Sequence, residues 1–145
     1  MEVNITFLGG ASTVTGSKYL VRHNGHSMLV DCGLFQGYKQ LRQRNWQPLP
    51  LAPGQIDAVV LTHAHLDHVG RLPKLFREGY RGPVYATRAT ALLMEIVLED
   101  ALKVMDEPFF GPEDVEEALG HLRPLEYGEW LRLGALSLAF GQAGH

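Results

Sequence analysis

The sequence has very little cysteine: Cys32 is the one thiol among 145 residues, so no disulfide can form within the chain. It also lacks an apolar run approaching the roughly 20 residues that a membrane-spanning helix needs. Positive charge is not in excess, since 13 Lys and Arg stand against 16 Asp and Glu, for a formal net charge of -3 at pH 7. Nucleic-acid binding by bulk positive charge is therefore excluded, and a polyanion would need a local site. The single thiol, and a start without a basic and apolar leader, favour a reduced, cytoplasmic protein.

The length and the remaining composition, with 46% hydrophobic and 20% charged residues, are those of one globular domain or a piece of a larger one. Eleven acidic residues crowd the segment 95–129, where only Lys103 and Arg123 are basic. This pattern favours the solvated faces of helices. Residues 1–70 hold three Asn, five Gln and one Glu, whereas residues 71–145 hold no Asn, one Gln and nine Glu. The change suggests a fusion near residues 60–70, with chance fluctuation as the alternative.

Hydrophobic periodicity predicts a mixed α/β chain in which strands come first. Strands are expected at residues 3–8, 18–22, 27–31, 58–62 and 83–86, and a three-stranded meander at 122–127, 130–133 and 135–140. The second and third strands flank Asn24-Gly25, a strong hairpin signal because both residues tolerate a positive φ. The run at 58–62 is continuously apolar, as in a strand covered on both faces.

Helices are expected at residues 69–78, from an N-cap at Thr87 to about Met105, and from Pro112 to Gly120. In the longest of them, one apolar stripe is expected to face the core; its members are Ala89, Leu92, Leu93, Ile96 and Val97. Residues 33–55 have no clean period and are punctuated by glycine and proline. An irregular stretch of that length is often functional.

The reactive side chains are concentrated in Thr62-His63-Ala64-His65-Leu66-Asp67-His68. Three imidazoles and a carboxylate at the end of a buried strand would be costly without a function. His63 and His65 are two residues apart, so on an extended segment they point to the same side and can hold one metal ion. Asp67 and His68 follow where the chain turns toward the next helix, and can face a second ion. Nitrogen and oxygen ligands without thiolate suit Zn²⁺, with Mn²⁺ or Fe²⁺ as alternatives.

An H-x-H-x-D-H motif after an apolar strand resembles the metallo-β-lactamase superfamily. The segments 9–17 (GGASTVTGS), 31–37 (DCGLFQG) and 63–73 (HAHLDHVGRLP) are similar to its β-CASP ribonuclease branch. That branch includes the endonuclease subunit of the eukaryotic cleavage and polyadenylation specificity factor. The resemblance implies metal-dependent hydrolysis of RNA phosphodiesters. It also implies half of an αββα sandwich, an α/β fold in which one mixed sheet carries helices on one face.

The resemblance also implies roles for individual residues. His63 and His65 would ligate a first metal ion, Asp67 and His68 a second, and His145 would complete the first set. Without the resemblance, a terminal histidine would be a flexible side chain or a tag remnant. Asp31 would support the site through hydrogen bonds without binding metal. Asp67 is the expected catalytic carboxylate.

The family continues with a bridging Asp, a last His and an inserted β-CASP domain, none of which has a counterpart in residues 1–145. The chain is therefore expected to be a partial metallo-β-lactamase domain with one tightly bound zinc ion, against two in the intact family, and with low or no activity alone. RNA is the expected partner, no membrane is expected, and an uncovered sheet face predicts a homodimer. The alternatives are a non-catalytic zinc-binding half-domain that self-associates, and a hydrolase of small esters, thioesters or lactams.

Overall fold

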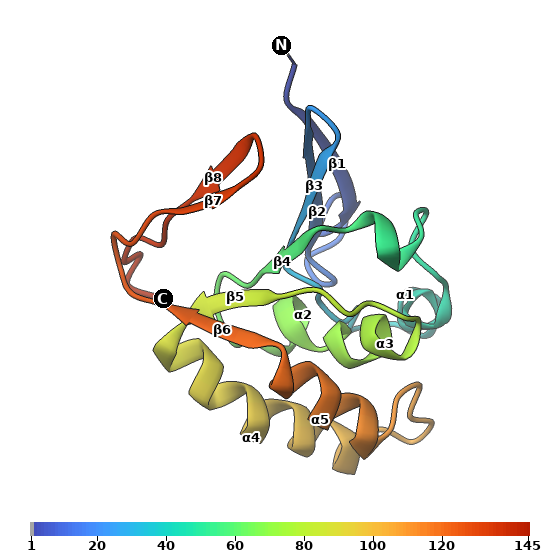
Figure 1. Ribbon diagram of the computed structural model, residues 1–145. Coiled ribbons are helices and arrows are strands. Elements are labelled where there is room, and N and C mark those ends of the chain that lie inside the picture. Colours follow the sequence, from blue (N-terminus) through green and yellow to red (C-terminus); the bar gives the residue numbers. More distant parts are fainter. Residues whose placement is uncertain (1) are drawn as a thin grey trace.

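In the computed structural model, which describes residues 2–145, a mixed six-stranded sheet carries helices on one face and a β-hairpin over part of the other (Figure 1). The sheet strands, in chain and spatial order, are β1 (Asn4–Gly9), β2 (Lys18–His23), β3 (His26–Val30), β4 (Ala58–Val60), β5 (Val84–Thr87) and β6 (Leu122–Leu125). The helices that connect or cover them are α1 (Lys39–Arg42), α2 (Leu66–Val69), α3 (Leu72–Arg77), α4 (Arg88–Val104) and α5 (Pro112–Gly120). The hairpin is β7 (Leu131–Leu133) with β8 (Leu136–Leu138). The predicted α/β class, with one mixed sheet and helices on one face, is confirmed.

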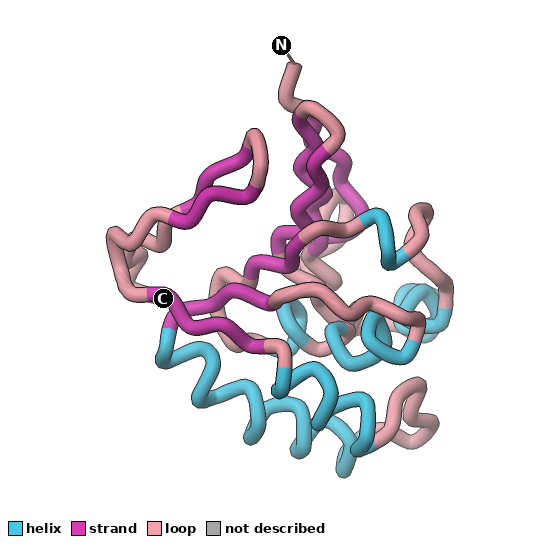
Figure 2. Tube along the Cα trace, in the orientation of Figure 1, coloured by secondary structure: helices cyan, strands magenta, loops and turns pink. Residues whose placement is uncertain are grey.

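Strand directions change at β3. Strands β1 to β3 are antiparallel, and the turn between β2 and β3 has φ values of 47° at Asn24 and 77° at Gly25, as its sequence predicts. Strands β3 to β6 are parallel, because helical crossovers return the chain to the same end of the sheet (Figure 2). The carboxyl ends of β3 and β4 therefore lie side by side, and the loops that follow them meet.

Helix α4 packs differently from the prediction. The expected N-cap is confirmed, since the Thr87 hydroxyl accepts from the Thr90 amide. The buried row, however, is Thr90, Met94, Leu98 and Ala101, whereas Leu92 is 71% exposed. The predicted inward stripe (Ala89, Leu92, Leu93, Ile96 and Val97) is thus wrong: it is exposed apart from the half-buried Val97. Because α4 has apolar residues on two faces, periodicity alone cannot tell which one meets the sheet.

The expected helix at 69–78 forms as the shorter α3 (Leu72–Arg77), and a separate helix, α2, begins inside the histidine motif. The expected meander after residue 122 does not form, because β6 pairs in parallel with β5 and only β7 and β8 pair as a hairpin. The segment 122–125 follows helix α5, so its natural partner is the strand before that crossover.

The irregular stretch at 33–55 is ordered by side chain to backbone hydrogen bonds. It contains α1 and two short 3₁₀ turns, η1 (Gln43–Trp46) and η2 (Pro53–Gln55). The buried Asn45 side chain accepts from the Phe35 amide at 2.7 Å and donates to the Phe35 carbonyl at 2.8 Å. These two hydrogen bonds hold the segment in place although its sequence has no hydrophobic periodicity.

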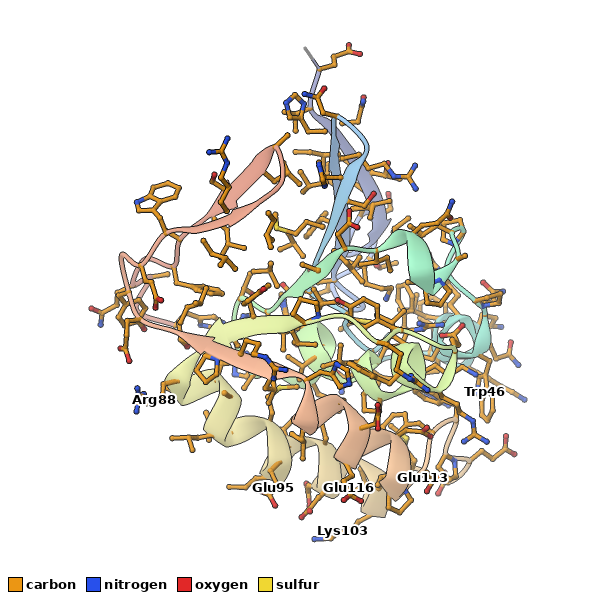
Figure 3. All side chains as sticks on the ribbon, viewed as in Figure 1. Trp46, Arg88, Glu95, Lys103, Glu113 and Glu116 are labelled. Carbon is orange, nitrogen blue, oxygen red and sulfur yellow. The ribbon has the colours of Figure 1, made fainter. Side chains whose placement is uncertain are left out.

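The acidic segment lies on the surface, as its pattern predicts. Figure 3 shows Glu95, Glu113 and Glu116 on the outer side of α4 and α5, and all three are exposed. None of the helices in the described chain is long and apolar enough to cross a membrane.

Candidate metal centre

Three loops that are distant in sequence form one unit beside the histidine motif. The Ser17 amide donates to the Asp67 carbonyl at 3.0 Å, and the Gly33 amide donates to the Ser17 carbonyl at 3.0 Å. The Cys32 amide donates to the His68 carbonyl at 2.9 Å. Backbone hydrogen bonds thereby hold together the loops that follow β1, β3 and β4. The histidine motif, which lies in the loop after β4 and the start of α2, is fixed by these bonds.

Gly33 makes the closest approach in this unit. A Cβ atom at residue 33 would lie 1.7 Å from the Asp67 carbonyl oxygen and 2.3 Å from its carbonyl carbon. Only glycine allows the loop after β3 to approach the start of α2 so closely.

The structure brings together the three histidines predicted for the first metal ion. The ring nitrogens of His63, His65 and His145 that can act as ligands lie within 4.8 Å of one another. The His145 ring centroid is 4.6 Å from that of His63 and 5.0 Å from that of His65. Within residues 2–145, this is the group of three or more His, Cys, Asp or Glu side chains that could hold one ion. Three imidazoles are a donor set that suits zinc, so the residues fit such an ion.

Hydrogen bonding determines which nitrogen of His63 is free. The Thr62 hydroxyl lies 2.8 Å from Asp31 Oδ2 and 2.9 Å from His63 Nδ1. A carboxylate can only accept, so the hydroxyl donates to Asp31 and accepts from His63 Nδ1–H. This tautomer leaves a lone pair on Nε2, a buried atom without a hydrogen-bond partner among the described residues. An unpaired buried acceptor that faces two other imidazoles is the ligand atom a metal site requires.

Burial and the neighbouring imidazoles favour the neutral form of His63. Burial, followed by the neighbouring imidazoles of His68, His145 and His65, lowers the pKa of the His63 ring below its usual value. A proton on Nε2 is therefore disfavoured, and its lone pair stays available for a cation.

Asp31 organises the other half of the motif. Its backbone has φ = 62°, a conformation that aspartate tolerates better than most residues, and its side chain is buried. The carboxylate accepts from the Thr62 amide at 2.8 Å and from His68 Nδ1 at 2.8 Å. His68 Nε2 is thus directed to Asp67 Oδ2, 3.4 Å away. The structure places Asp67 and His68 together, but within residues 2–145 the two belong to no group of three His, Cys, Asp or Glu ligand atoms.

Lys18 is a supporting residue that the sequence did not reveal. Its buried Nζ donates to the carbonyls of Gly16 at 2.8 Å and Gly33 at 2.9 Å, and lies 4.1 Å from the centre of the Phe35 ring. Burial lowers the pKa of Lys18 to about 8. A lysine at the start of an alternating strand is normally assigned to solvent, so no pattern pointed to this role.

The fold and site correspond to a known class. Residues 13–133 match the family model described as the Metallo-beta-lactamase superfamily, and the chain belongs to this superfamily, whose members bind metal ions. Among solved structures, it is similar to a metallo-beta-lactamase from Cronobacter sakazakii with a mutated HARLDQ motif. The two share 25% identity with a TM-score of 0.60, over 93% of this chain and 49% of that one.

Two curated relatives narrow the comparison. The chain is 75% identical over 143 residues, 99% of its length, to ribonuclease TTHA0252 of Thermus thermophilus, of which it covers 33%. It is 34% identical over 148 residues to the transcription termination factor FttA of Methanocaldococcus jannaschii, of which it covers 23%. The chain therefore spans a third or less of these relatives. The predicted superfamily is confirmed, and the relatives agree with the resemblance to β-CASP ribonucleases. The alignment with the Thermus thermophilus relative covers 99% of this chain and includes residues 60–70, where the composition changes and a fusion was suggested.

Proposed function

We propose that this chain supplies the metal-binding half of a ribonuclease active site that hydrolyses RNA phosphodiesters. The observation that carries the proposal is the unpaired, buried Nε2 of His63, in a ring that clusters with those of His65 and His145. The relative that is named a ribonuclease supports RNA as the substrate. RNA cleavage by the chain alone is expected to be weak, because it spans a third of that relative.

The chain's own residues have separable tasks in this proposal. His63, His65 and His145 would hold one Zn²⁺ ion, which when bound supplies Lewis acidity and a lowered pKa for water. Asp67 would accept a proton from the attacking water. Asp31 would fix the tautomer of His68 by accepting from Nδ1, which leaves a lone pair on His68 Nε2 beside Asp67 Oδ2, so that these two atoms could share a second ion.

Asp67→Asn tests the reaction. We expect zinc-loaded wild-type chain to cleave labelled single-stranded RNA slowly, and Asp67→Asn to reduce the rate by at least 100-fold, the scale of general-base loss. Zinc content should remain unchanged, because Asp67 is outside the three-histidine cluster. Asp100→Asn, an exposed carboxylate on α4, is the matched control and should keep the full rate.

A nitrocefin assay runs beside the RNA assay to detect lactam hydrolysis. Full RNA cleavage by the Asp67→Asn chain would show that Asp67 has no catalytic role. Zinc binding without cleavage of either substrate would support the second candidate, a non-catalytic zinc-binding half-domain. That candidate is favoured because, within residues 2–145, Asp67 and His68 belong to no group of three ligand atoms.

We also propose that two copies pair through the sheet face opposite the helices. The β7–β8 hairpin covers this face at Val60, but Ile5 and Phe7 at the edge strand β1 are 56% and 63% exposed. Their cross-strand neighbours Val21 and Tyr19 continue the same apolar face. Burying several hundred Å² of it at about 25 cal/mol per Å² is worth many kcal/mol, and a two-fold dimer lets the patch meet its own copy.

Light scattering at micromolar concentration tests this pairing. We expect a mass near twice 16.1 kDa for the wild type. Phe7→Ser should shift it toward the monomer, whereas Leu92→Ser, an equally exposed apolar residue on α4, should not. A monodisperse wild type at 16.1 kDa would contradict the proposal.

A further inference from the structure

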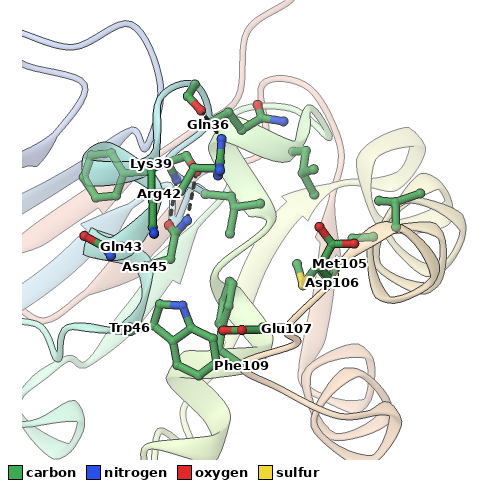
Figure 4. Close-up of a pocket in the computed structure, with 16 residues that line it drawn as sticks. Gln36, Lys39, Arg42, Gln43, Asn45, Trp46, Met105, Asp106, Glu107 and Phe109 are labelled. Atoms are coloured by element: carbon green, nitrogen blue, oxygen red, sulfur yellow. Dashed lines mark hydrogen bonds between the residues drawn. The ribbon is translucent and has the colours of Figure 1, made fainter.

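A cleft of about 610 Å³ lies beside the metal-binding loop, between the α1–η1 segment and the chain that follows α4 (Figure 4). Leu66, which stands between His65 and Asp67 in the motif, lines it. The cleft therefore adjoins the loop that carries the candidate ligands. Its volume is that of a site for a small ligand or a few units of a polymer, and is too small for a double helix.

One wall of the cleft is positively charged, in contrast to the chain as a whole. Residues 32–56 contain Lys39, Arg42 and Arg44 but no Asp or Glu, although the whole chain has a net charge of -3. Lys39 and Arg42 line the cleft and are exposed. In the described part of the chain, no carboxylate forms an ion pair with any of the three. Such cations are available for phosphate groups.

An aromatic ring lies next to these cations. Trp46 lines the cleft, is 47% exposed, and meets Phe109 edge-on with ring centroids 5.5 Å apart. The Arg44 guanidinium lies 4.2 Å from the centre of the Phe35 ring, and Asn45 fixes Phe35 through two hydrogen bonds. A partly exposed indole on a preformed wall can stack a nucleobase without prior rearrangement.

The opposite wall is acidic and sets the orientation of a ligand. Asp106 and Glu107 line the cleft, and Figure 4 shows Asp106 on the side away from Lys39 and Arg42 and Glu107 beside Trp46 and Phe109. A phosphate backbone is repelled by them and is confined to the side of Lys39 and Arg42. A base stacked on Trp46 can turn its Watson–Crick edge toward the carboxylates, which accept hydrogen bonds from amino groups.

We propose that this cleft binds an unpaired segment of RNA, with a base stacked on Trp46 and phosphates on Lys39 and Arg42. The inference deepens the proposed function and rests on it, because it names the part of the chain that holds substrate outside the reacting bond. Single strands are preferred because a base in a duplex does not offer its face for stacking.

Tryptophan emission provides a direct measurement. The chain has two tryptophans, so Trp130→Phe leaves Trp46 as the only emitter. In this background, with EDTA present so that no metal is bound, titration with a single-stranded oligoadenylate RNA should quench the emission. An RNA duplex at the same nucleotide concentration should quench it far less. Unchanged emission at saturating oligoadenylate would overturn the proposal.

Fluorescence anisotropy of labelled oligoadenylate tests the contacts separately. Trp46→Leu should weaken binding about tenfold, within the range that loss of one stacked base causes, and Trp46→Phe should restore most of it. Lys39→Gln with Arg42→Gln should weaken binding and reduce the slope of log affinity against log salt by about 1.4, or 0.7 per lost phosphate contact. Arg132→Gln, an exposed arginine on β7, is the matched control and should bind like wild type. Equal affinity and slope in the double variant and this control would also overturn the proposal.

Asp67→Asn separates this inference from the proposed function. Its oligoadenylate affinity in EDTA should equal that of wild type. In the wild type, retained binding without zinc-dependent cleavage would contradict only the ribonuclease reaction. Cleavage with no contribution from Trp46, Lys39 or Arg42 to binding would contradict only the cleft.

Discussion

Gly33→Ala is expected to destabilise the protein by about 3 kcal/mol or more, at the upper end of the range for overpacked sites. The added Cβ atom would lie 1.7 Å from the Asp67 carbonyl oxygen, a backbone atom that cannot rotate away. Relief requires separation of the loop after β3 from the start of α2. That separation breaks the hydrogen bond from the Cys32 amide to the His68 carbonyl.

Urea unfolding measures this effect, and Gly54→Ala provides the matched control. A Cβ atom at residue 54 meets nothing within 4 Å, and its φ is not positive, so this substitution should change the free energy of unfolding by less than about 0.5 kcal/mol. Zinc uptake should also fall in Gly33→Ala, because the loop carrying the motif is displaced. A Gly33→Ala chain as stable as Gly54→Ala would show that the loops are not held against each other in solution.

His65→Ala is expected to abolish stoichiometric zinc binding. The wild type should retain about one ion per chain after chelator washing, reloading and desalting, whereas His65→Ala should retain almost none. A tetrahedral zinc site cannot keep high affinity with two protein ligands. The loss should exceed the 10- to 100-fold that removal of an outer hydrogen-bond partner causes.

Elemental analysis measures zinc content, and thermal unfolding adds an independent readout. A ligand that binds only the folded state stabilises it by about 2.7 kcal/mol at a concentration 100 times its Kd. Zinc should therefore raise the Tm of wild type but not that of His65→Ala. His23→Ala removes an imidazole distant from the motif in sequence and should behave like wild type. Equal zinc in His65→Ala and wild type would contradict the ligand assignment.

Asp31 links the two halves of the histidine motif. Its carboxylate holds both the Thr62 hydroxyl, which fixes the tautomer of His63, and Nδ1 of His68. A displacement of the loop after β3 is therefore expected to move Nε2 of His63 and Nε2 of His68. Loop packing and metal affinity are expected to change together.

Much of the fold could be predicted from the sequence because its signals are local. The Asn24-Gly25 turn, the buried strand before the motif and the Thr87 cap each depend on a few neighbouring residues. The same holds for the histidine motif, whose spacing places ligand-type side chains on one short segment. The motif also indicated the superfamily, which the match over residues 13–133 confirms.

What the sequence could not determine is which surfaces meet. Helix α4 is apolar on two faces, and only packing against the sheet selects the row of Thr90, Met94 and Leu98 over the stripe at Leu92. The pairing of β6 with β5 likewise depends on where α5 returns the chain. Such choices are made between segments far apart in the chain, and periodicity within one segment carries no information about them.

The sequence by itself determined which ligand-type residues this protein has, the order in which they come, and the strand that they follow. Tertiary structure alone decided how they are used. It brings His145 to His63 and His65, leaves the Nε2 of His63 without a hydrogen-bond partner among residues 2–145, and buries Lys18 beneath Gly33. The physical reason is that a lone pair becomes a ligand only when desolvation and fixed neighbours leave a cation as its remaining partner, and these conditions arise only when distant loops are packed together.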